Sequence, residues 1–314
     1  MKITTNWLRE YLNQPNNLDL LDSMTSLGLE VESHNKLGKE SVIDLDITPN
    51  RSDCLSIYGV ARDLSAKYNL KVNNIKMSKL EIKKNSKIIN MIDHKIAPVY
   101  SGLILNNFDN SVDTPSFISS KLEACGISRV NFIVDLINFT MIEIGQPMHA
   151  FDIDKLSGQI SVDSSRKGET IHCLNGKSYE LLTNTPVIAD NSGPIAIAGV
   201  IGGQLTAVDK NSKSVFIESA YFTPDLIRLS SKNYRIQTDS SHRFERGVDP
   251  SLPNIALKRL VYLVSKELNM KTMDIFAFSK TKFLKKSRGK IRLSLKAMIK
   301  NLGIEINEKF VINT

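Results

Sequence analysis

Cysteine and tryptophan are scarce in this sequence of 314 residues, which has three cysteines and one tryptophan. Cys54, Cys125 and Cys173 lie far apart and form no CxxC pair, so neither a zinc knuckle nor a disulfide framework is indicated. This cysteine usage is typical of a reducing compartment, and we expect a cytoplasmic protein.

Long apolar runs are also missing. No segment approaches the roughly 20 apolar residues of a membrane span, so we expect no membrane partner. The N-terminal MKITTNWLREYL carries charged and amide groups throughout and lacks the apolar segment of a signal peptide. No Walker loop, HEXXH motif or other metal-ligand spacing is present, which predicts no metal site in this chain.

The composition is that of an ordinary globular protein, with 41% hydrophobic and 24% charged residues. The length suits about two domains of roughly 100–200 residues each. The net charge of +8 favours a polyanionic partner such as RNA. A lysine-rich, solvated surface explains the same charge equally well, so charge alone does not decide between them.

The first 70 residues predict a small α+β unit of two helices, a strand and a third helix. We expect Thr5 to cap the first helix and Gly28 to end the second. Alternating Ile43, Leu45 and Ile47 indicate a half-buried strand, and the third helix is expected to start near Ser52 or Asp53.

A larger mixed α/β region follows. Its predicted elements are a strand at 99–105, a helix capped by Thr114, a helix at about 131–144, strands at 187–189, 195–198 and 215–219, and helices from Thr223 and at 255–268. Asn175-Gly176 is expected to form a hairpin turn with positive φ at both residues.

The overall fold class is therefore predicted to be α+β, with three parts at 1–85, 86–280 and 281–314. The stretch 280–290 contains six basic residues and reads as a linker. A helix from Leu295 to Leu302, ended by Gly303, follows it. About 25 residues cannot bury a core alone, so this tail reads as the start of a third domain.

Three segments carry a resemblance to a known family. They are ITPNRSDCLSIYGVAR at 47–62, EIGQPMHAFD at 143–152 and TDSSHRFERGVD at 238–249. Together, and in this order, they resemble segments of the β subunit of bacterial phenylalanyl-tRNA synthetase. The resemblance implies a B1 domain at 1–85, a B3/B4 editing domain at 86–280 and the beginning of a B5 domain at 281–314.

The resemblance also has gaps. In the usual subunit an OB-fold tRNA-binding domain follows the first two helices, whereas here residues 28–32 lead through 33–40 directly to the strand at 42–47. The C-terminal half of the family, with its synthetase-like core and anticodon-binding domain, has no counterpart in the sequence.

Site residues follow from the resemblance position by position. Glu218 matches the glutamate that recognises the tyrosine hydroxyl, and His149 matches a histidine near the ester. The other matching positions are Gly199, Gly202, Asn138 and Thr238. Ile137 stands where the family usually has threonine, and Ser240 where it usually has alanine. Read without the family, Glu218 suits a solvated strand residue, His149 a structural histidine and the glycines a turn.

The implied function is that of a β-subunit polypeptide of phenylalanine–tRNA ligase that hydrolyses mischarged Tyr-tRNA(Phe). Its implied partners are the α subunit, in an α2β2 assembly, and tRNA(Phe). ATP and Mg²⁺ are implied for the complete αβ enzyme, and this chain alone is expected to bind neither. Two alternatives stay open: a noncatalytic module that binds RNA or the α subunit, and a free-standing trans-editing hydrolase.

Overall fold

The computed structural model describes residues 1–13, 19–38, 40–83, 86–268, 273–279 and 292–313. Met1–Lys280 pack together as one unit, and Thr281–Thr314 form a second. The predicted boundary at residue 85 thus falls inside the first unit, and the predicted linker at 280–290 lies outside the described residues. The α+β class predicted from the sequence is confirmed.

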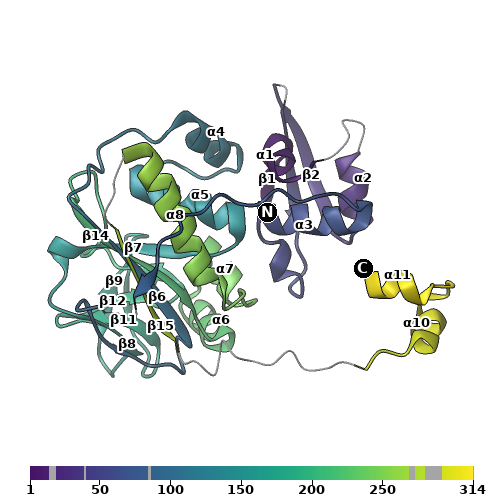
Figure 1. Cartoon of the computed structure of the whole chain (residues 1–314). Helices are drawn as coiled ribbons and strands as arrows, with labels where there is room; N and C mark the ends of the chain where they lie inside the picture. The colour runs from purple at the N-terminus through teal and green to yellow at the C-terminus, as the bar shows by residue number, and fades with distance from the viewer. Residues whose placement is uncertain (14–18, 39, 84–85, 269–272, 280–291, 314) are drawn as a thin grey trace. The chain divides into compact units, whose positions relative to one another are not determined.

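One sheet of the first unit carries the site, and its strand order is β4-β15-β6-β14-β7 (Figure 1). Its strands are β4 (Ile82–Lys83), β15 (Asp274–Ser279), β6 (Val99–Asn106), β14 (Ser214–Tyr221) and β7 (Met148–Asp152). Strand β14 is antiparallel to both of its neighbours, β6 and β7. The strands predicted at 99–105 and 215–219 are therefore confirmed, and they pair with each other.

The two faces of this sheet are covered differently. Helices α5 (Phe132–Ile144) and α8 (Leu252–Leu268) pack against one face. A second sheet lies against the other and consists of β13 (Ile201–Gly202), β12 (Gly193–Ile197), β11 (Pro186–Asp190), β8 (Ile160–Ser164) and β5 (Ile89–Ile92). Because side chains alternate along a strand, Ile217 joins the helical core and Phe216 the core between the sheets.

The remaining elements of this region are short. They are α4 (Ser116–Ala124), η2 (Ile153–Lys155), the hairpin β9 (Thr170–His172) and β10 (Ser178–Glu180), α6 (Pro224–Tyr234) and α7 (Asp239–Phe244). The hairpin predicted at Asn175-Gly176 is confirmed, but of the two only Gly176 has a positive φ, at 75°. The loop Cys173–Lys177 is longer than a two-residue turn, which relieves Asn175 of the left-handed conformation.

The N-terminal residues form a three-stranded sheet with helices. The elements are β1 (Lys2–Thr4), α1 (Thr5–Tyr11), α2 (Leu20–Thr25), β2 (Glu30–Leu37), β3 (Glu40–Asp46), η1 (Ser52–Cys54) and α3 (Ile57–Tyr68). Strand β2 was not predicted, because its side chains are almost all exposed and show no alternation. It pairs directly with β3 as a hairpin, so no OB fold is inserted between them, as expected.

Three predicted helix starts are wrong by one or a few residues. Thr4, not Thr5, caps α1 by accepting from the Trp7 N–H. Ser56 caps α3, and the residues near Ser52 form only a 3₁₀ turn. The Thr114 hydroxyl does not cap α4 and instead donates to the buried Asp135 carboxylate at 2.6 Å. For α1 and α3 several nearby hydroxyls are equivalent as cap residues, and tertiary packing selects one. Helix α4 begins after Pro115 and has no side-chain cap.

Most of the first family-like segment serves local structure. Ser56 accepts a hydrogen bond from the Gly59 N–H at 3.0 Å, which caps α3. A Cβ at position 59 would lie 1.8 Å from the Asp53 carbonyl oxygen, so only glycine fits there. Arg51 pairs with Asp53 at 3.1 Å and with Asp63 at 2.8 Å, joining the turn to the helix.

A buried ion pair ties the N-terminal elements to helices α5 and α8. Glu143 on α5 and Arg259 on α8 form two hydrogen bonds of 2.6 and 2.7 Å, and Glu143 is 1% exposed. The Tyr11 hydroxyl on α1 donates to the same carboxylate. Burial and the nearby Glu143 charge raise the pKa of Tyr11 well above its usual range, so the phenol keeps its proton and remains a donor.

The second unit contains two short helices, α10 (Leu295–Leu302) and α11 (Glu308–Asn313). The predicted helix ended by Gly303 is confirmed. None of the described residues of this unit whose exposure is given is buried, which agrees with its being too small to form a core. Across the described ranges of both units, no helix is long and apolar enough to cross a membrane.

Replacing Glu143 should destabilise the first unit strongly. Glu143→Ala leaves the Arg259 guanidinium buried without its carboxylate, and we expect a loss of about 3–5 kcal/mol in the free energy of unfolding. Urea unfolding followed by circular dichroism measures this loss.

Glu10→Ala is the matched control, because Glu10 is about half exposed and pairs with Lys121 at 2.7 Å. Its effect should stay below about 1 kcal/mol. Equal effects of the two substitutions would contradict a dominant role of the buried pair.

Candidate functional site

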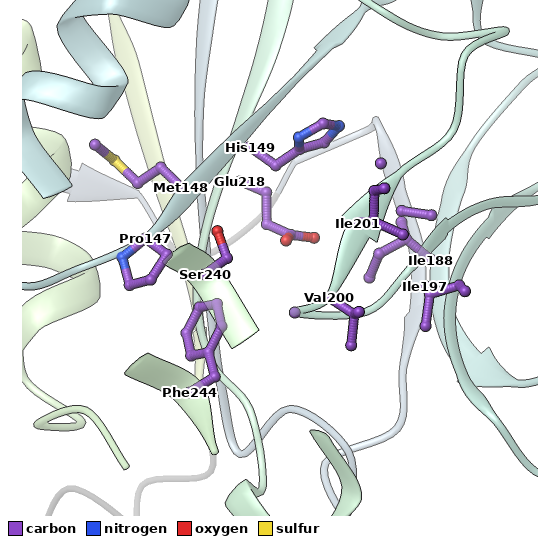
Figure 2. Close-up of a pocket in the computed structure, with 13 residues that line it drawn as sticks. Pro147, Met148, His149, Ile188, Ile197, Val200, Ile201, Glu218, Ser240 and Phe244 are labelled. Carbon is purple, nitrogen blue, oxygen red and sulfur yellow. The ribbon is translucent and has the colours of Figure 1, made fainter. Parts of the chain in front are cut away.

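A small cavity lies between the two sheets of the first unit and measures about 50 Å³, room for a few water molecules. Its lining consists of Pro147, Met148, His149, Ile188, Ala196, Ile197, Gly199, Val200, Ile201, Gly202, Glu218, Ser240 and Phe244. Figure 2 shows the Glu218 carboxyl among them, with Ser240 and Phe244 on one side and Val200 and Ile188 on the other. The lining is mostly apolar, so the few polar groups determine what it can bind.

Glu218 is the buried acid of this cavity. It lies on β14 directly opposite His149 of β7, and its side chain is 6% exposed. The Tyr100 hydroxyl on β6 donates to Glu218 Oε2 at 2.7 Å. Burial raises the pKa of Glu218 to about 7, although the hydrogen bond from Tyr100 acts in the opposite direction. At neutral pH this group is thus present in both its ionised and its protonated form.

His149 is a neutral imidazole. Burial lowers its pKa to about 4, so at pH 7 the ring carries no proton beyond its single N–H. Nε2 is buried and has no hydrogen-bond partner among the described protein atoms, while the ring packs edge-on against Phe151 at 4.6 Å. A buried nitrogen of this kind is available to a bound ligand or to water.

The two glycines of the segment AGVIGG allow close packing against the site. A Cβ at position 202 would lie 2.3 Å from His149 Cε1, so the backbone of Gly202 lies directly against the imidazole. Gly199 has a φ of 67°, and a Cβ there would lie 3.0 Å from Phe222 and from Ile227. Both positions therefore need glycine for a physical reason, and both line the cavity. Their catalytic role stays a prediction.

Ser240 and Thr238 come from the start of α7. Ser240 lines the cavity, whereas Thr238 does not and caps α7 through its contact with the Ser241 N–H. The Thr238 hydroxyl also donates to the Val200 carbonyl oxygen at 2.8 Å. This bond connects the helix to the glycine-containing turn, so in this structure Thr238 positions the wall of the cavity.

Ile137 and Asn138 are not among the residues that line the cavity. Both lie on α5, and Ile137 is 5% exposed and packs in the core on the helical side of the sheet. Asn138 is half-buried on the same helix. Their roles as a substrate-binding and a catalytic residue stay predictions that the resemblance alone supports.

Tyr100 was missed by the sequence analysis, although it donates the hydrogen bond to Glu218. Its strand was predicted, but its partner lies 118 residues further along the chain. Phe244, Val200 and the isoleucines of the second sheet were missed as well. Alternation along β6 would have placed Tyr100 on one face, but only the strand pairing shows which carboxylate shares that face.

A second cavity of about 640 Å³ is lined by residues of all three family-like segments, among them Ser56, Gly145 and Asp249. Its charged groups have local partners: Asp53 pairs with Arg62, and Asp249 accepts from Ser251. No buried side-chain atom without a partner is found in its described lining. The smaller cavity, with Glu218 and His149, is therefore the better candidate for chemistry.

The described ranges contain no set of side chains suited to bind a metal ion. Within them, no group of three or more His, Cys, Asp or Glu side chains is arranged to hold an ion. The three cysteines are free and buried, and burial raises the pKa of Cys173 to about 11, which keeps its thiol protonated.

Comparison with known proteins shows that the region containing this cavity matches a protein family. Residues 96–269 match the model of the B3/4 domain family. This range contains every predicted site residue and Tyr100. A crystal structure of an N-terminal fragment of the phenylalanyl-tRNA synthetase β subunit from Pyrococcus horikoshii aligns with 99% of this chain and 86% of the fragment, with 15% identity and a TM-score of 0.44. A score of that size does not establish a shared fold.

Several curated relatives are β subunits of phenylalanine–tRNA ligase. The protein from Francisella tularensis is 36% identical over 273 residues, which cover 87% of this chain and 34% of the relative. The protein from Hahella chejuensis is 40% identical over 244 residues, which cover 76% of this chain and 30% of the relative. The protein from Fusobacterium nucleatum is 38% identical over 291 residues, which cover 90% of this chain and 36% of the relative. The chain spans about one third of the length of these relatives.

Glu218→Gln should change how stability depends on pH. The folded pKa of about 7 exceeds the ordinary value of 4.5, so the native state binds the proton more tightly than the unfolded state. This contribution to stability is present below about pH 4.5 and is lost as the pH rises to about 7. The loss amounts to roughly 3 kcal/mol at most, and Glu218→Gln should abolish it.

The measurement is the difference in unfolding free energy between the two proteins from pH 4.5 to 8. A difference is needed because His149 acts in the opposite sense: its lowered pKa costs stability as the pH falls from 6.5 to about 4. Parallel pH profiles for the two proteins would show that Glu218 does not titrate in this range.

Proposed function

The chain belongs to the B3/4 domain family and resembles the N-terminal part of phenylalanine–tRNA ligase β subunits, and from this premise we propose that its cavity hydrolyses mischarged Tyr-tRNA(Phe). A synthetase pocket for phenylalanine rejects the extra hydroxyl of tyrosine only weakly, by roughly 10². A second site that requires this hydroxyl corrects the error. The buried carboxylate of Glu218 in the cavity is the observation that carries the proposal.

Recognition of tyrosine rests on Glu218. A carboxylate accepts a hydrogen bond from a phenol, and such charge-assisted bonds are stronger than neutral ones. The ring of the substrate would lie among Ile197, Val200 and Phe244, which are apolar, and the cavity of about 50 Å³ would have to widen to admit it. Phenylalanine would fill the same space and leave the buried carboxylate without its donor, which is costly. The site therefore favours tyrosine over phenylalanine.

Hydrolysis needs little more than an oriented water molecule. The water oxygen attacks the ester carbonyl carbon, the bond from that carbon to the ribose oxygen breaks, and the ribose oxygen takes up a proton. His149, neutral at pH 7, has a ring nitrogen available to orient the water or to hold the terminal ribose. Gly202 keeps the backbone close to this ring, and Gly199 shapes the adjoining turn.

Ser240 and Ile137 are the departures from the family pattern. Ser240 adds a hydroxyl to the cavity wall beside the proposed position of the ring. Ile137 lacks the hydroxyl that threonine would supply on α5, and with Asn138 it lies outside the lining of the cavity. Thr238 supports the wall through Val200. Editing by this chain thus depends chiefly on Glu218 and His149.

In the family context the chain would act with the α subunit and tRNA(Phe), as part of a ligase that forms Phe-tRNA. ATP and Mg²⁺ belong to that complete enzyme. Among the described residues of this chain, no group of three or more His, Cys, Asp or Glu side chains could hold a metal ion. A noncatalytic binding module and a free-standing trans-editing hydrolase are the competing functions, and the deacylation experiment separates them.

Deacylation of purified Tyr-tRNA(Phe) and Phe-tRNA(Phe) tests the proposal. The chain should release tyrosine faster than phenylalanine. In Glu218→Ala this preference should fall by about 10- to 100-fold, the effect of one hydrogen bond to a charged group. Glu180→Ala, at an exposed strand position of the same region, is the matched control and should keep the preference.

Each outcome selects one function. Release by the isolated chain indicates self-sufficient editing, and release only after addition of the α subunit indicates a component of the complex. No release under either condition would overturn editing and leave the noncatalytic module.

Gly202→Ala should impair hydrolysis through His149. The added methyl group would overlap the imidazole, and displacement of the ring by about 1 Å is expected to lower the rate by roughly 10- to 100-fold. In a His149→Ala background the same substitution has no ring to displace. A double-mutant cycle of deacylation rates should therefore show Gly202→Ala to be neutral in that background, whereas additive losses would contradict the coupling.

A further inference from the structure

Tyr100 is a buried tyrosine directly behind the acid of the site. Its side chain is 0% exposed, and it does not line the cavity. On β6 it is paired with Ala220 of β14, two residues from Glu218, so both side chains lie on the face between the two sheets. The residue of β6 opposite Glu218 is Gly102, which has no side chain to stand between the phenol and the carboxylate.

The hydrogen bond from Tyr100 is the one that Glu218 makes to the described protein. Tyr100 donates to Oε2 at 2.7 Å. A carboxylate has about four acceptor positions on its two oxygens. For Oε1 no hydrogen bond to another described residue is found, and Oε1 does not belong to the fully buried atoms that lack a partner. Glu218 itself lines the cavity. One oxygen is therefore held from behind, and the other is left for a ligand.

We propose that Tyr100 is a specificity-determining positioning residue, whose phenol favours the carboxylate form of Glu218 and directs it into the cavity. It thereby makes the site select aminoacyl esters whose side chain ends in a hydroxyl donor. This inference rests on the proposed function and extends it, because it places part of the selectivity on a residue that does not touch the substrate.

The electrostatics around Glu218 support this role. Burial favours the protonated carboxyl, and donation by Tyr100 is the opposing contribution that favours the carboxylate. Burial raises the pKa of Tyr100 well above 10, so it remains a donor throughout the physiological range. His149, on the neighbouring strand β7, is the other titratable group that faces Glu218, and it is neutral above about pH 4. The described residues that line the cavity include no Lys or Arg, and the hydrogen bond from the phenol favours the ionised carboxyl.

Tyr100→Phe tests the proposal, because it removes one oxygen and keeps the ring. Deacylation of Tyr-tRNA(Phe) and Phe-tRNA(Phe) is measured from pH 6 to 9. We expect the preference for tyrosine at pH 7 to fall about tenfold, with the release of phenylalanine unchanged. The preference for tyrosine should rise with pH as Glu218 ionises, and the pH at the midpoint of this rise should be higher by about one unit in Tyr100→Phe. The reason is that the carboxylate loses the hydrogen-bond donor that stabilises it. A purely structural role would change rates without moving this midpoint.

Two further variants make the test specific. Tyr262→Phe on α8 removes a phenol oxygen for which no hydrogen bond to another described residue is found, and it should leave the preference and the midpoint unchanged. In a Glu218→Gln background Tyr100→Phe should have no further effect on the preference, because no carboxylate remains to be held. This comparison also applies if Tyr100→Phe alone lowers stability.

The outcomes are distinct. An unchanged preference and midpoint in Tyr100→Phe, with an active unsubstituted chain, would overturn this inference and leave the proposed function intact. The same loss in both backgrounds would overturn it too, since Tyr100 would then act independently of Glu218. If the unsubstituted chain releases neither amino acid, alone or with the α subunit, the proposed function fails and this inference fails with it.

Discussion

The double pairing of β14 is the constraint on which the structure of the site depends. Each residue from Val215 to Ser219 is paired with β6 on one side and β7 on the other. This register puts Glu218 beside His149 and diagonal to Tyr100, and it sends Val215 and Ile217 into the helical core. A shift by one residue would turn Glu218 into the helical core and an isoleucine or a serine into the cavity. The same hydrogen bonds therefore determine the packing of both cores and the chemistry of the cavity.

Buried polar contacts hold the N-terminal elements against this sheet and its helices. Glu143 and Arg259 meet Tyr11 of α1, and the fully buried Arg243 of α7 donates to the Leu55 carbonyl oxygen at 3.2 Å. The three family-like segments supply Leu55, Glu143 and Arg243 to these contacts. The second and third segments also supply residues of the cavity lining, among them His149 and Ser240. Several residues that carry the resemblance have structural roles: Ser56 caps a helix, Gly59 permits close backbone approach and Arg243 satisfies a buried carbonyl group. A family resemblance built on such residues identifies the fold securely, whereas the chemistry depends on the few side chains in the cavity.

The two titratable groups of the cavity have pKa values in the reverse of their usual order. Burial lowers the pKa of His149 to about 4 and raises that of Glu218 to about 7. No ion pair forms between them at neutral pH, although they are paired directly across two strands. A neutral imidazole suits the handling of water or a ribose hydroxyl, and a carboxyl near its pKa responds strongly to a single donor such as Tyr100. Low polarity in the lining thus makes individual hydrogen bonds decisive.

The sequence by itself determined the α+β class and most of the helices, but it missed strands such as β2 and β7. The family resemblance selected Glu218, His149, Gly199, Gly202 and Ser240, and the structure brings these five residues together around one cavity. Those conclusions rest on local patterns or on motifs, which neighbouring residues specify. The tertiary structure decided which residues are in contact. It brings the Tyr100 hydroxyl to Glu218 and the Thr238 hydroxyl to the Val200 carbonyl oxygen, and it packs Ile137 on the helical side of the sheet. It also decided which of several hydroxyls caps a helix. The physical reason is that strand register and burial join residues as far apart as 118 positions, and no local pattern encodes that pairing.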